Sequence, residues 1–393
     1  MSADAGIAAI VLAAGRSSRM GTSKALLPLG SGSVIERVVR SVLQAGVGDI
    51  LVVTGHGAEH LAPVLDGLRA REVHNPDWEV GMFSSVQAGV RTLSDGVEAF
   101  FVLPVDCPLV GPKVLERLLQ SFHEGERGIL YPSCCGRRGH PPLISGRYRD
   151  ALLQANKGDN LRSFLERHPG DVLDVQVEDI TVLMDMDTAE DHRRMSLFAD
   201  IIDGVERASE AGDASLTPAE ALYLLSLLEV PDHVIRHCRT VAVVGQALAE
   251  ALKCRLPDFD VDLVRSACLL HDMARGERRH AAIGQSILSS LGLCRLGSIV
   301  GSHMFMPPEM LEAPLVSEDE LVYLADKLVI EGEVGSFEER SARALRQGAG
   351  DPAALDGVRT RMRTAQIIRE KVETILERPL AEVLGQATGP LGS

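Results

Sequence analysis

The sequence predicts two domains, an N-terminal α/β domain built on a doubly wound sheet and a C-terminal domain made of helices alone. The first observation behind this prediction is residues 7–13 (IAAIVLA), an unbroken apolar run typical of a strand buried on both faces of a parallel sheet. The second is that strand patterns alternate with helix patterns up to about residue 188, after which only helical periodicity follows. The third is the length of 393 residues, which exceeds the size of one ordinary hydrophobic core.

The elements of the N-terminal domain follow from these patterns in chain order. Short apolar runs that end at glycine, proline or polar residues predict strands, and apolar residues spaced three and four apart predict helices. The expected strands are 7–13, 50–54, 72–74, 99–104, 128–132 and 180–184. The expected helices are 34–45, 58–69, 84–93, 147–155, 159–167 and one that begins near Thr188.

The second half of the chain shows no strand pattern after Ala189. A threonine followed by proline is a common helix start, so Thr217-Pro218 predicts the beginning of a helix after the small, polar stretch 210–217. Helices are expected at 196–208, 218–229, 232–253, 261–275, 279–291, 319–330, 336–346 and 353–383. We therefore expect an N-terminal domain over 1–195, a linker over 196–216, a helical domain over 217–385 and a tail over 386–393, to which we assign no function.

Composition excludes several classes of protein. A formal net charge of −15 and a pI near 5.3 argue against a surface for nucleic acid or anionic membranes, which needs a basic stripe. No window reaches the ~20 apolar residues of a membrane span, and the first residues lack the basic leader of a signal peptide. The seven cysteines show no CxxC spacing for zinc. We therefore expect a cytoplasmic protein with reduced thiols.

The loop after the first strand concentrates positive charge. Gly15 and Gly21 permit close approach of the backbone, whose N–H groups can bind phosphate oxygens. Arg16, Arg19 and Lys24 add three cations within nine residues. The segment matches neither the Walker pattern GxxxxGK[ST] nor GxGxxG. A purely structural glycine loop is the alternative, but cations directly after a buried strand favour phosphate binding.

Residues 12–28 (LAAGRSSRMGTSKALLP) resemble the LAAGxSxRMGxxKxLLP signature of the MobA-like nucleotidyltransferases, whose fold is GT-A-like. The Ala-Ala-Gly form resembles the branch that transfers cytidylyl groups, because guanylyl-transferring relatives more often have Ala-Gly-Gly. The resemblance implies that Arg19 and Lys24 stabilise the charge on the leaving pyrophosphate. It also implies nucleotide contacts from Leu12, Ala13, Ala14, Gly15, Arg16 and Lys24.

Aspartates that follow apolar segments are the candidate metal ligands. Asp106 follows the strand 99–104 and is expected at the C-terminal edge of the sheet, where open α/β folds bind ligands. Its carboxylate suits Mg²⁺, although a turn or N-cap aspartate is the alternative. Residues 183–191 (LMDMDTAED) resemble the family's DIDTPED segment, which supplies a second carboxylate toward the metal. Asp185 and Asp187 are nearly equal candidates, and Asp187 is also a candidate N-cap in a capping box with Glu190.

Two further segments match the same family in order and spacing. Residues 75–85 (NPDWEVGMFSS) resemble its NPxWxxGMxxS loop, which closes over the base and phosphates, and this implies that Ser84 binds the nucleotide and that Asp106 contacts it as well. Residues 137–142 (RRGHPP) resemble its RxGHP segment, which contributes to the pocket for the acceptor substrate. The resemblance implies that Arg138 and His140 bind the acceptor. Without the other segments, this stretch would be only a basic turn.

The helical half carries a second set of candidate ligands. An adjacent His-Asp pair at the end of the apolar stretch 264–270 is costly to bury unless it is paired or binds a metal. Further histidines and an aspartate complete an ordered set: His237, His271, Asp272, His280, His303 and Asp326. This order resembles the H…HD…H…H…D pattern of the HD-domain metal-dependent phosphohydrolases that hold two metals. The resemblance implies one metal on His237, His271, Asp272 and Asp326, and a second on His280, His303 and a bridging Asp272.

Mixed imidazole and carboxylate ligands suit Fe, Mn, Zn or Co better than Mg²⁺ alone. Each piece of this set also has a plainer interpretation. His-Asp dipeptides occur by chance, and Asp326-Lys327 could be an ion pair at the surface. His233, one helical turn before His237, is expected to be background because only His237 is followed by the family's pattern.

These resemblances imply a two-domain enzyme. The leading expectation is Mg²⁺-dependent transfer of CMP from CTP to molybdenum-bound molybdopterin, with a molybdoenzyme as a recipient of the product. One alternative keeps the reaction but changes the substrate, to a sugar phosphate, a polyol phosphate or GTP. Another makes the HD half a metal- or nucleotide-binding regulatory module without hydrolysis.

Overall fold

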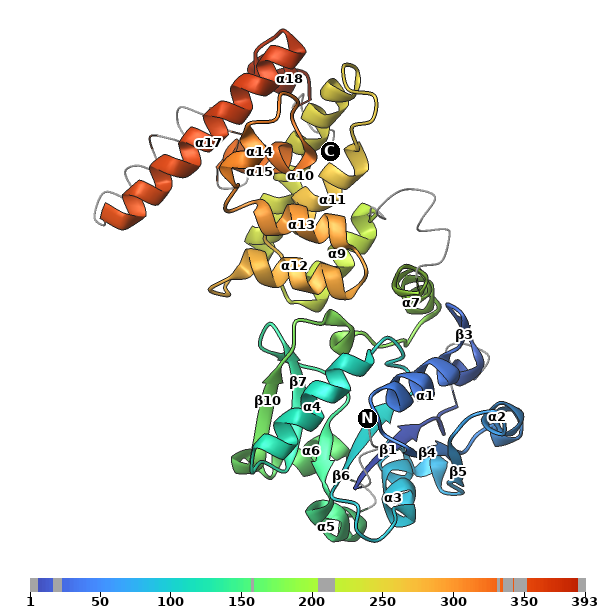
Figure 1. Cartoon of the computed structure of the whole chain (residues 1–393). Coiled ribbons are helices and arrows are strands. Elements are labelled where there is room, and N and C mark those ends of the chain that lie inside the picture. The colour runs from blue at the N-terminus through green and yellow to red at the C-terminus, as the bar shows by residue number, and fades with distance from the viewer. Residues whose placement is uncertain are drawn as a thin grey trace. The chain divides into compact units, whose positions relative to one another are not determined.

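The computed structural model describes residues 6–16, 23–156, 159–203, 216–330, 333–334, 342 and 352–387. The chain divides into two compact units, Met1–Arg207 and Ala208–Ser393, which we describe separately (Figure 1). Helix α7 (Ala189–Ile202) continues into the range expected for the linker, and residues 204–215 of that range lie outside the described part. The domain boundaries themselves stay a prediction. Among the described residues, no helix combines the length and apolarity that a membrane span needs.

The N-terminal unit is built on one mixed sheet with the strand order β10-β7-β9-β6-β1-β4-β5. The central strand β1 (Ile7–Leu12) is buried along its whole length and runs parallel to both neighbours. β9 alone runs antiparallel to the strands on its two sides, and the short β8 (Arg137–Arg138) pairs with β7. The other strands are β4 (Asp49–Thr54), β5 (Arg71–His74), β6 (Ala99–Pro104), β7 (Ile129–Cys134), β9 (Leu143–Ser145) and β10 (Val172–Gln176).

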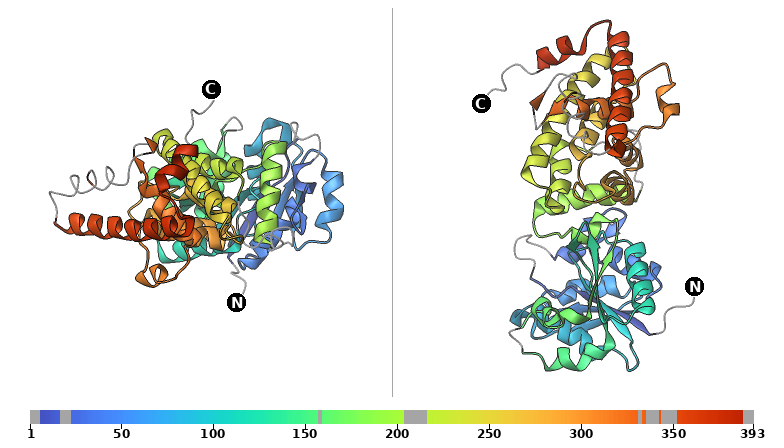
Figure 2. Two further views of the ribbon diagram at one scale, coloured as in Figure 1. Left: turned by 90° about the horizontal axis from the view of Figure 1, so that it is seen from above. Right: turned by 90° about the vertical axis from the view of Figure 1, so that its left-hand side faces the viewer.

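Helices cover both faces of this sheet (Figure 2), which is why β1 carries no polar side chain. On one face, the buried core joins Ile10 of β1 to Val86 of α3, Leu152 of α5 and Phe164 of α6. Helix α4 has no counterpart among the predicted helices, although Pro112 begins it and its buried leucines have helical spacing. The α-helices that precede α7 in this unit are α1 (Val34–Gln44), α2 (Ala58–Leu65), α3 (Met82–Thr92), α4 (Pro112–Glu124), α5 (Arg149–Gln154) and α6 (Leu161–Glu166).

The strand predicted over 180–184 is wrong. These residues form the 3₁₀ helix η5 (Ile180–Leu183), and the last strand of the sheet is β10 instead. The cause is local, because Asp179 Oδ1 accepts hydrogen bonds from Thr181 N at 2.9 Å and Thr181 Oγ1 at 2.6 Å. Such a side-chain turn draws the backbone away from an extended course.

The C-terminal unit is mainly helical. Thr217 and Glu220 form the capping box that begins α9, as the sequence predicts. The expected absence of strands is wrong, since β11 (Val329–Ile330) and β12 (Glu333–Val334) form a small hairpin and end the helix predicted over 319–330. The helix predicted over 353–383 is divided near Pro379, and the one at 336–346 falls almost entirely outside the described residues. The helices are α9 (Pro218–Leu227), α10 (Asp232–Lys253), α11 (Val261–Leu270), α12 (His280–Ser290), α13 (Cys294–Ser302), α14 (Pro308–Leu311), α15 (Glu318–Lys327), α17 (Pro352–Leu376) and α18 (Leu380–Ala387).

Candidate active sites

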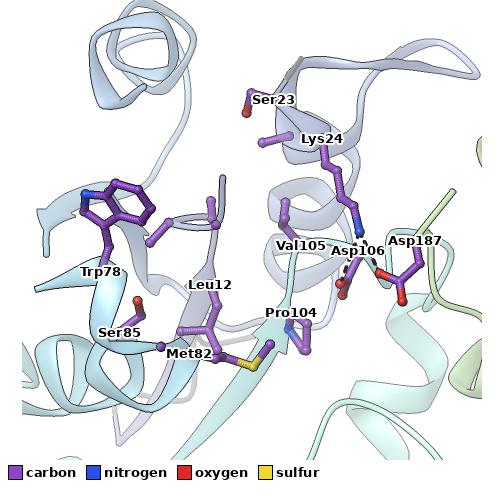
Figure 3. A pocket seen from close by; sticks show the side chains of 15 residues that line it. Leu12, Ser23, Lys24, Trp78, Met82, Ser85, Pro104, Val105, Asp106 and Asp187 are labelled. Atoms are coloured by element: carbon purple, nitrogen blue, oxygen red, sulfur yellow. Dashed lines mark hydrogen bonds and ion pairs between the residues drawn. The ribbon is translucent and has the colours of Figure 1, made fainter. Parts of the chain in front are cut away.

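A cavity of about 420 Å³ opens at the C-terminal edge of the sheet, where β1 and β6 end side by side with Leu12 opposite Pro104. This is the edge at which open α/β folds bind ligands. Figure 3 shows Trp78 on one side of the cavity and Lys24 and Asp106 on the other. The lining residues are Leu12–Gly15, Ser23–Ala25, Trp78, Gly81, Met82, Ser85, Pro104–Asp106 and Asp187.

The backbone that leaves β1 forms one wall of this cavity. Ala13 N donates to Val53 O at 2.9 Å, and His56 N donates to Ala14 O at 3.3 Å, so this stretch stays tied to the end of β4. A Cβ added to Gly15 would meet no atom within 4 Å. The space in front of Gly15 is therefore open to a ligand.

Most of the predicted nucleotide contacts lie on the cavity, but not all of them. Arg16 is exposed and does not line it, and Arg19 lies outside the described residues, so its predicted role is not tested by the structure. The predicted contacts that line the cavity are Leu12, Ala13, Ala14, Gly15, Lys24 and Asp106.

Lys24 joins the two predicted carboxylates. It begins the 3₁₀ helix η1 (Lys24–Leu26), and its Nζ lies 2.8 Å from Asp187 Oδ1 and 3.9 Å from Asp106 Oδ2. Burial raises the pKa of Asp106, Lys24 lowers it, and the charges of Asp187 and Asp185 raise it further. Among the described side chains, Asp106, Asp185 and Asp187 outnumber Lys24, and a divalent cation relieves such a group of carboxylates.

Asp185 and Asp187 are distinguished by their surroundings. Met186 N donates to Asp106 O at 2.9 Å and its side chain is buried, which places the segment 185–187 beside Asp106. Asp187 lines the cavity and contacts Lys24, whereas Asp185 does not line it. Desolvation and the charge of Asp187 raise the pKa of Asp185.

The capping box predicted for Asp187 and Glu190 is wrong by one residue. The N-cap of α7 is Thr188, whose Oγ accepts from Asp191 N at 3.2 Å, while Asp191 Oδ2 accepts from Thr188 N at 2.8 Å. Because Thr188 caps the helix, the carboxylate of Asp187 points to Lys24 and the cavity instead of the helix end (Figure 3).

The loop 75–85 forms the opposite wall. Buried Asn75 donates from Nδ2 to Ser84 Oγ at 2.9 Å and to Ser85 Oγ at 3.0 Å. Ser84 Oγ in turn donates to the backbone oxygens of Asp77 and Gly81, at 2.9 and 2.8 Å. Ser84 thus braces the loop, and its neighbour Ser85 is the serine of this loop that lines the cavity. Nucleotide binding by Ser84 stays a prediction.

Trp78 is a cavity residue that has no place among the predicted site residues. Its ring meets that of His56 edge-on, with centroids 5.2 Å apart. Gly55 makes this position possible, since a Cβ there would lie 2.7 Å from Trp78 Cβ and 2.9 Å from Ala14 Cβ. The tryptophan within the NPDWEVGM segment is the sequence signal that could have identified it.

The two predicted acceptor residues have different surroundings. Arg138 donates from Nε and Nη2 to the carboxylate of Asp174, at 2.6 and 3.1 Å, which ties its guanidinium to β10. Desolvation lowers the pKa of His140, while the charges of Asp106 and Asp185 raise it. His140 therefore lies near the carboxylate cluster, although neither residue lines the cavity. Their binding roles stay a prediction.

All six predicted ligands of the helical half lie in one cluster. They come from five places in the fold, namely α10, the end of α11, the start of α12, the end of α13 and α15. Within the described residues, two groups of ligand atoms converge to within 4.8 Å, and Asp272 belongs to both. The groups are His237, His271 and Asp272, and Asp272, His280 and His303.

The distances agree with a shared carboxylate. Asp272 Oδ1 lies 3.5 Å from His280 Nε2 and 3.7 Å from His303 Nε2, while Asp272 Oδ2 lies 3.5 Å from His271 Nε2. Asp326 Oδ1 lies 3.1 Å from His237 Nε2 and 3.6 Å from His271 Nε2. Each of the two positions thus receives both imidazole and carboxylate atoms.

Backbone contacts orient the two buried imidazoles. His271 Nδ1 donates to Cys268 O at 2.8 Å, and His303 Nδ1 donates to Val300 O at 2.6 Å, so in the neutral rings both Nε2 atoms face the centre as acceptors. His271 Nε2 is buried and has no hydrogen-bond partner among the described residues. An orphaned acceptor in a buried site fits a metal ligand, because leaving it unsatisfied is costly.

A cationic side chain pairs with each of the two carboxylates. Lys327 pairs with Asp326, and Arg275 pairs with Asp272. Although burial alone would raise it, Lys327 and the hydrogen bond from His237 hold the pKa of Asp326 well below its usual range. Asp326 and Lys327 are only 7% and 5% exposed, so the alternative of a surface ion pair is wrong. His233 is exposed on α10, outside both groups, as expected.

Comparison with known proteins assigns a family to each half of the chain. The profile of the MobA-like NTP transferase domain matches residues 9–172, and that of the HD domain matches residues 234–330. A nicotine blue oxidoreductase of Paenarthrobacter nicotinovorans is 31% identical over 196 residues, which are 48% of this chain and 96% of the relative. The chain belongs to the MobA-like NTP transferases. It is a nucleotidyltransferase whose MobA-like domain is followed by an HD domain.

Other relatives match the MobA-like half alone. The molybdenum cofactor cytidylyltransferase of Escherichia coli (strain K12) is 29% identical over 184 residues, 46% of this chain and 91% of the relative. The solved structure of a nucleotidyl transferase from Methanothermobacter thermautotroptrophicus covers 50% of this chain and 98% of its own, with 26% identity and a TM-score of 0.44. The relatives bear names of different activities, so membership of the family leaves the substrate of the MobA-like domain open.

Proposed function

We propose that the MobA-like domain transfers CMP from CTP to molybdenum-bound molybdopterin and releases pyrophosphate. The observation that carries this proposal is the cavity in which Lys24, Asp106 and Asp187 meet the backbone wall Leu12–Gly15. Such a site combines backbone groups for phosphates, a cation, and carboxylates in excess of it. A magnesium nucleotide has the complementary charge.

The surroundings of the cluster assign a task to each side chain. Asp106 and Asp187 would hold Mg²⁺, whose chemistry is to neutralise and orient phosphate oxygens. Lys24 Nζ, 2.8 Å from Asp187, would neutralise charge that builds on the leaving pyrophosphate. The reaction needs an in-line approach of the acceptor phosphate to the α-phosphorus and no protein nucleophile, so positioning and charge are the protein's contribution.

Trp78 supports the placement of the base. It lies across the cavity from the charged cluster, and its edge-on contact with His56 fixes one side of the ring (Figure 3). A flat base on this side would leave the triphosphate to extend toward Lys24 and Asp106. The Ala13-Ala14-Gly15 form and the similarity to a cytidylyltransferase favour cytosine as that base.

The assignment of CTP as the nucleotide can be tested by tryptophan fluorescence. Trp78 is its single tryptophan, so intrinsic fluorescence reports nucleotide binding in the cavity without a label. We expect CTP with Mg²⁺ to change the emission at lower concentration than GTP, and pyrophosphate release to require molybdenum-bound molybdopterin. Faster release with GTP, or with a sugar or polyol phosphate as acceptor, would transfer the proposal to that substrate.

We propose that the HD domain hydrolyses a phosphoester with divalent transition metals, of which Fe, Mn, Zn and Co suit the ligands. The shared position of Asp272 supports a two-metal site, and metals held there supply activation of water and neutralisation of phosphate charge. His237, His271 and Asp326 would hold one ion, while His280 and His303 would hold the other.

The competing proposal for this domain is a regulatory module that binds metal or nucleotide without turnover. The full chain with Asp106→Asn, which silences the transferase site, separates the two when assayed with Mn²⁺ against nucleotides, dinucleotides and simple phosphoesters. Steady turnover that Asp272→Ala abolishes supports the hydrolase. Stoichiometric metal binding without turnover of any of these substrates supports the regulatory module. A molybdoenzyme would be the recipient of the transferase product.

A further inference from the structure

Helix α7 lies along the segment 24–37 of the MobA-like domain, beside the β2 (Pro28–Leu29) and β3 (Gly32–Ser33) hairpin (Figure 1). The two segments are far apart in the sequence, and one member of the charged cluster lies at the start of each. Lys24 stands at the start of the first, and Asp187 stands just before the second. Neither residue belongs to the sheet, so the strands alone do not fix their separation.

The first contact between the segments is the cluster itself. Lys24 Nζ donates to Asp187 Oδ1 at 2.8 Å. Asp191 Oδ2 accepts from Asp187 N at 3.2 Å and from Thr188 Oγ1 at 2.7 Å, so the first turn of α7 holds the backbone of Asp187. The carboxylate that faces the cavity therefore moves with the helix.

The second contact lies one turn further along α7. His192 Nε2 donates to Pro28 O at 2.8 Å. Pro28 follows Lys24 after only the short helix η1. This hydrogen bond therefore ties the residues that follow Lys24 to the helix that begins directly after Asp187 and its N-cap.

The third contact lies at the other end of the helix. Asp203 accepts from Arg37 Nη1 at 2.8 Å with each of its oxygens, and from Ser31 N at 3.2 Å with Oδ2. Gly30 permits this approach, because its φ is +59° and a Cβ there would lie 2.4 Å from Asp203 Oδ2. Both side chains of the pair are mostly buried, so solvent screens it less than a surface pair.

We propose that α7 is a splint that keeps Lys24 and Asp187 in register, with His192 and Asp203 as positioning residues for nucleotidyl transfer. The inference rests on the transferase half of the proposed function, because it concerns the same cluster. The physical reason is that small shifts of charged groups from their reactive positions can reduce turnover by about a hundredfold. A helix fixed at three points resists rotation and sliding, whereas a helix fixed only at its first turn does not.

A charge swap tests the ion pair between Arg37 and Asp203 at the C-terminal end of α7. Asp203→Arg and Arg37→Asp each place like charges together, and the double variant restores an ion pair of opposite sense. We expect each single variant to lower kcat/KM for pyrophosphate release about tenfold, and the double variant to recover at least a third of the wild-type value. His192→Leu should also lose about tenfold, while His192→Gln, which keeps an N–H donor, should lose less.

The matched control is Asp49→Asn, which breaks the 2.7 Å ion pair between Arg71 and Asp49 in the same domain, away from the cavity. It should leave turnover unchanged. Wild-type kinetics in the folded single variants would overturn the inference. A double variant that regains its melting temperature but not its turnover would also overturn it. The restored ion pair would then contribute to stability and not to the position of the reactive groups.

A wrong substrate assignment can be distinguished from a wrong proposal about α7. If the wild type releases no pyrophosphate with CTP and molybdenum-bound molybdopterin, the proposed reaction is wrong, and the splint is then judged from the Kd of Mg²⁺-CTP measured by Trp78 fluorescence. The single variants should raise this Kd and the double variant should restore it. Equal Kd values in all of them would reject the splint.

Discussion

Gly55 offers the sharpest test of the cavity geometry. A Cβ at this position would lie 2.7 Å from Trp78 Cβ, 2.8 Å from Trp78 Cγ and 2.9 Å from Ala14 Cβ. The substitution Gly55→Ala must therefore displace Trp78, Ala14 or the backbone between them. The φ of Gly55 lies outside the left-handed region, so the substitution tests packing and not backbone strain.

The size of the effect follows from the packing. Inserting a methyl group into a well-packed site costs about 1–3 kcal/mol. For a domain of about 150–250 residues, each kcal/mol lowers Tm by about 2–4 °C, so we expect a decrease of roughly 2–12 °C. Trp78 and Ala14 both line the cavity, and a displacement that costs about 1.4 kcal/mol of binding free energy weakens nucleotide affinity about tenfold.

The assay is thermal unfolding combined with titration of Mg²⁺-CTP, both followed by Trp78 fluorescence. The matched control is Gly48→Ala, because a Cβ at Gly48 meets no atom within 4 Å. The control should keep its melting temperature and its Kd. A Gly55→Ala variant with wild-type stability, emission spectrum and Kd would refute the contact between Gly55 and Trp78.

Three further predictions concern the charged groups. Burial raises the pKa of Asp106 above its unfolded value, so its ionised form opposes folding once the pH exceeds the unfolded pKa of about 3.8. Asp106→Asn should therefore raise the melting temperature at pH 7 without Mg²⁺ while it abolishes turnover; a lower melting temperature would contradict this. Lys24→Met should reduce kcat about 10²–10³-fold, the usual cost of removing a group that stabilises transition-state charge, and Lys24→Arg should recover part of it. A loss below threefold in pyrophosphate release would remove Lys24 from the mechanism. Asp272→Asn should reduce the metal content of the HD domain from two ions to at most one, because both ligand groups share this carboxylate; elemental analysis that still finds two ions would exclude a bridging role.

The strands show where sequence patterns succeed and where they fail. The apolar runs at 7–13, 50–54 and 99–104 correspond to β1, β4 and β6, since strands buried on both faces leave a clear signal. β9 and β10 were not predicted. β10 has only one buried residue, Val175, and β9 has only three residues, so neither carries a pattern that local reading can detect. Their places in the sheet depend on pairing with β7, which is a long-range property.

The helical half gives a similar contrast. The order of its histidines and aspartates predicted six ligands, and the structure brings these six side chains together, while metal binding stays a prediction. The burial of Lys327 and its pairing with Asp326 could not be predicted, because a lysine beside an aspartate at the end of a helix is most often solvated. Only the packing of α15 among α10, α11 and α17 removes it from water.

What the sequence determined by itself is local chemistry. The glycine and cation loop, the HD pattern and the buried runs are contiguous or ordered signals, and they were sufficient to predict the two fold classes and the two families. Only the tertiary structure decided which side chains meet. Lys24 and Asp187 are 163 residues apart and come together because β1 and β6 end side by side and α7 returns to the same edge. The choice of Asp187 over Asp185 at the cavity, and the presence of Trp78 and Ser85 on its wall, follow from this packing, which no single segment encodes.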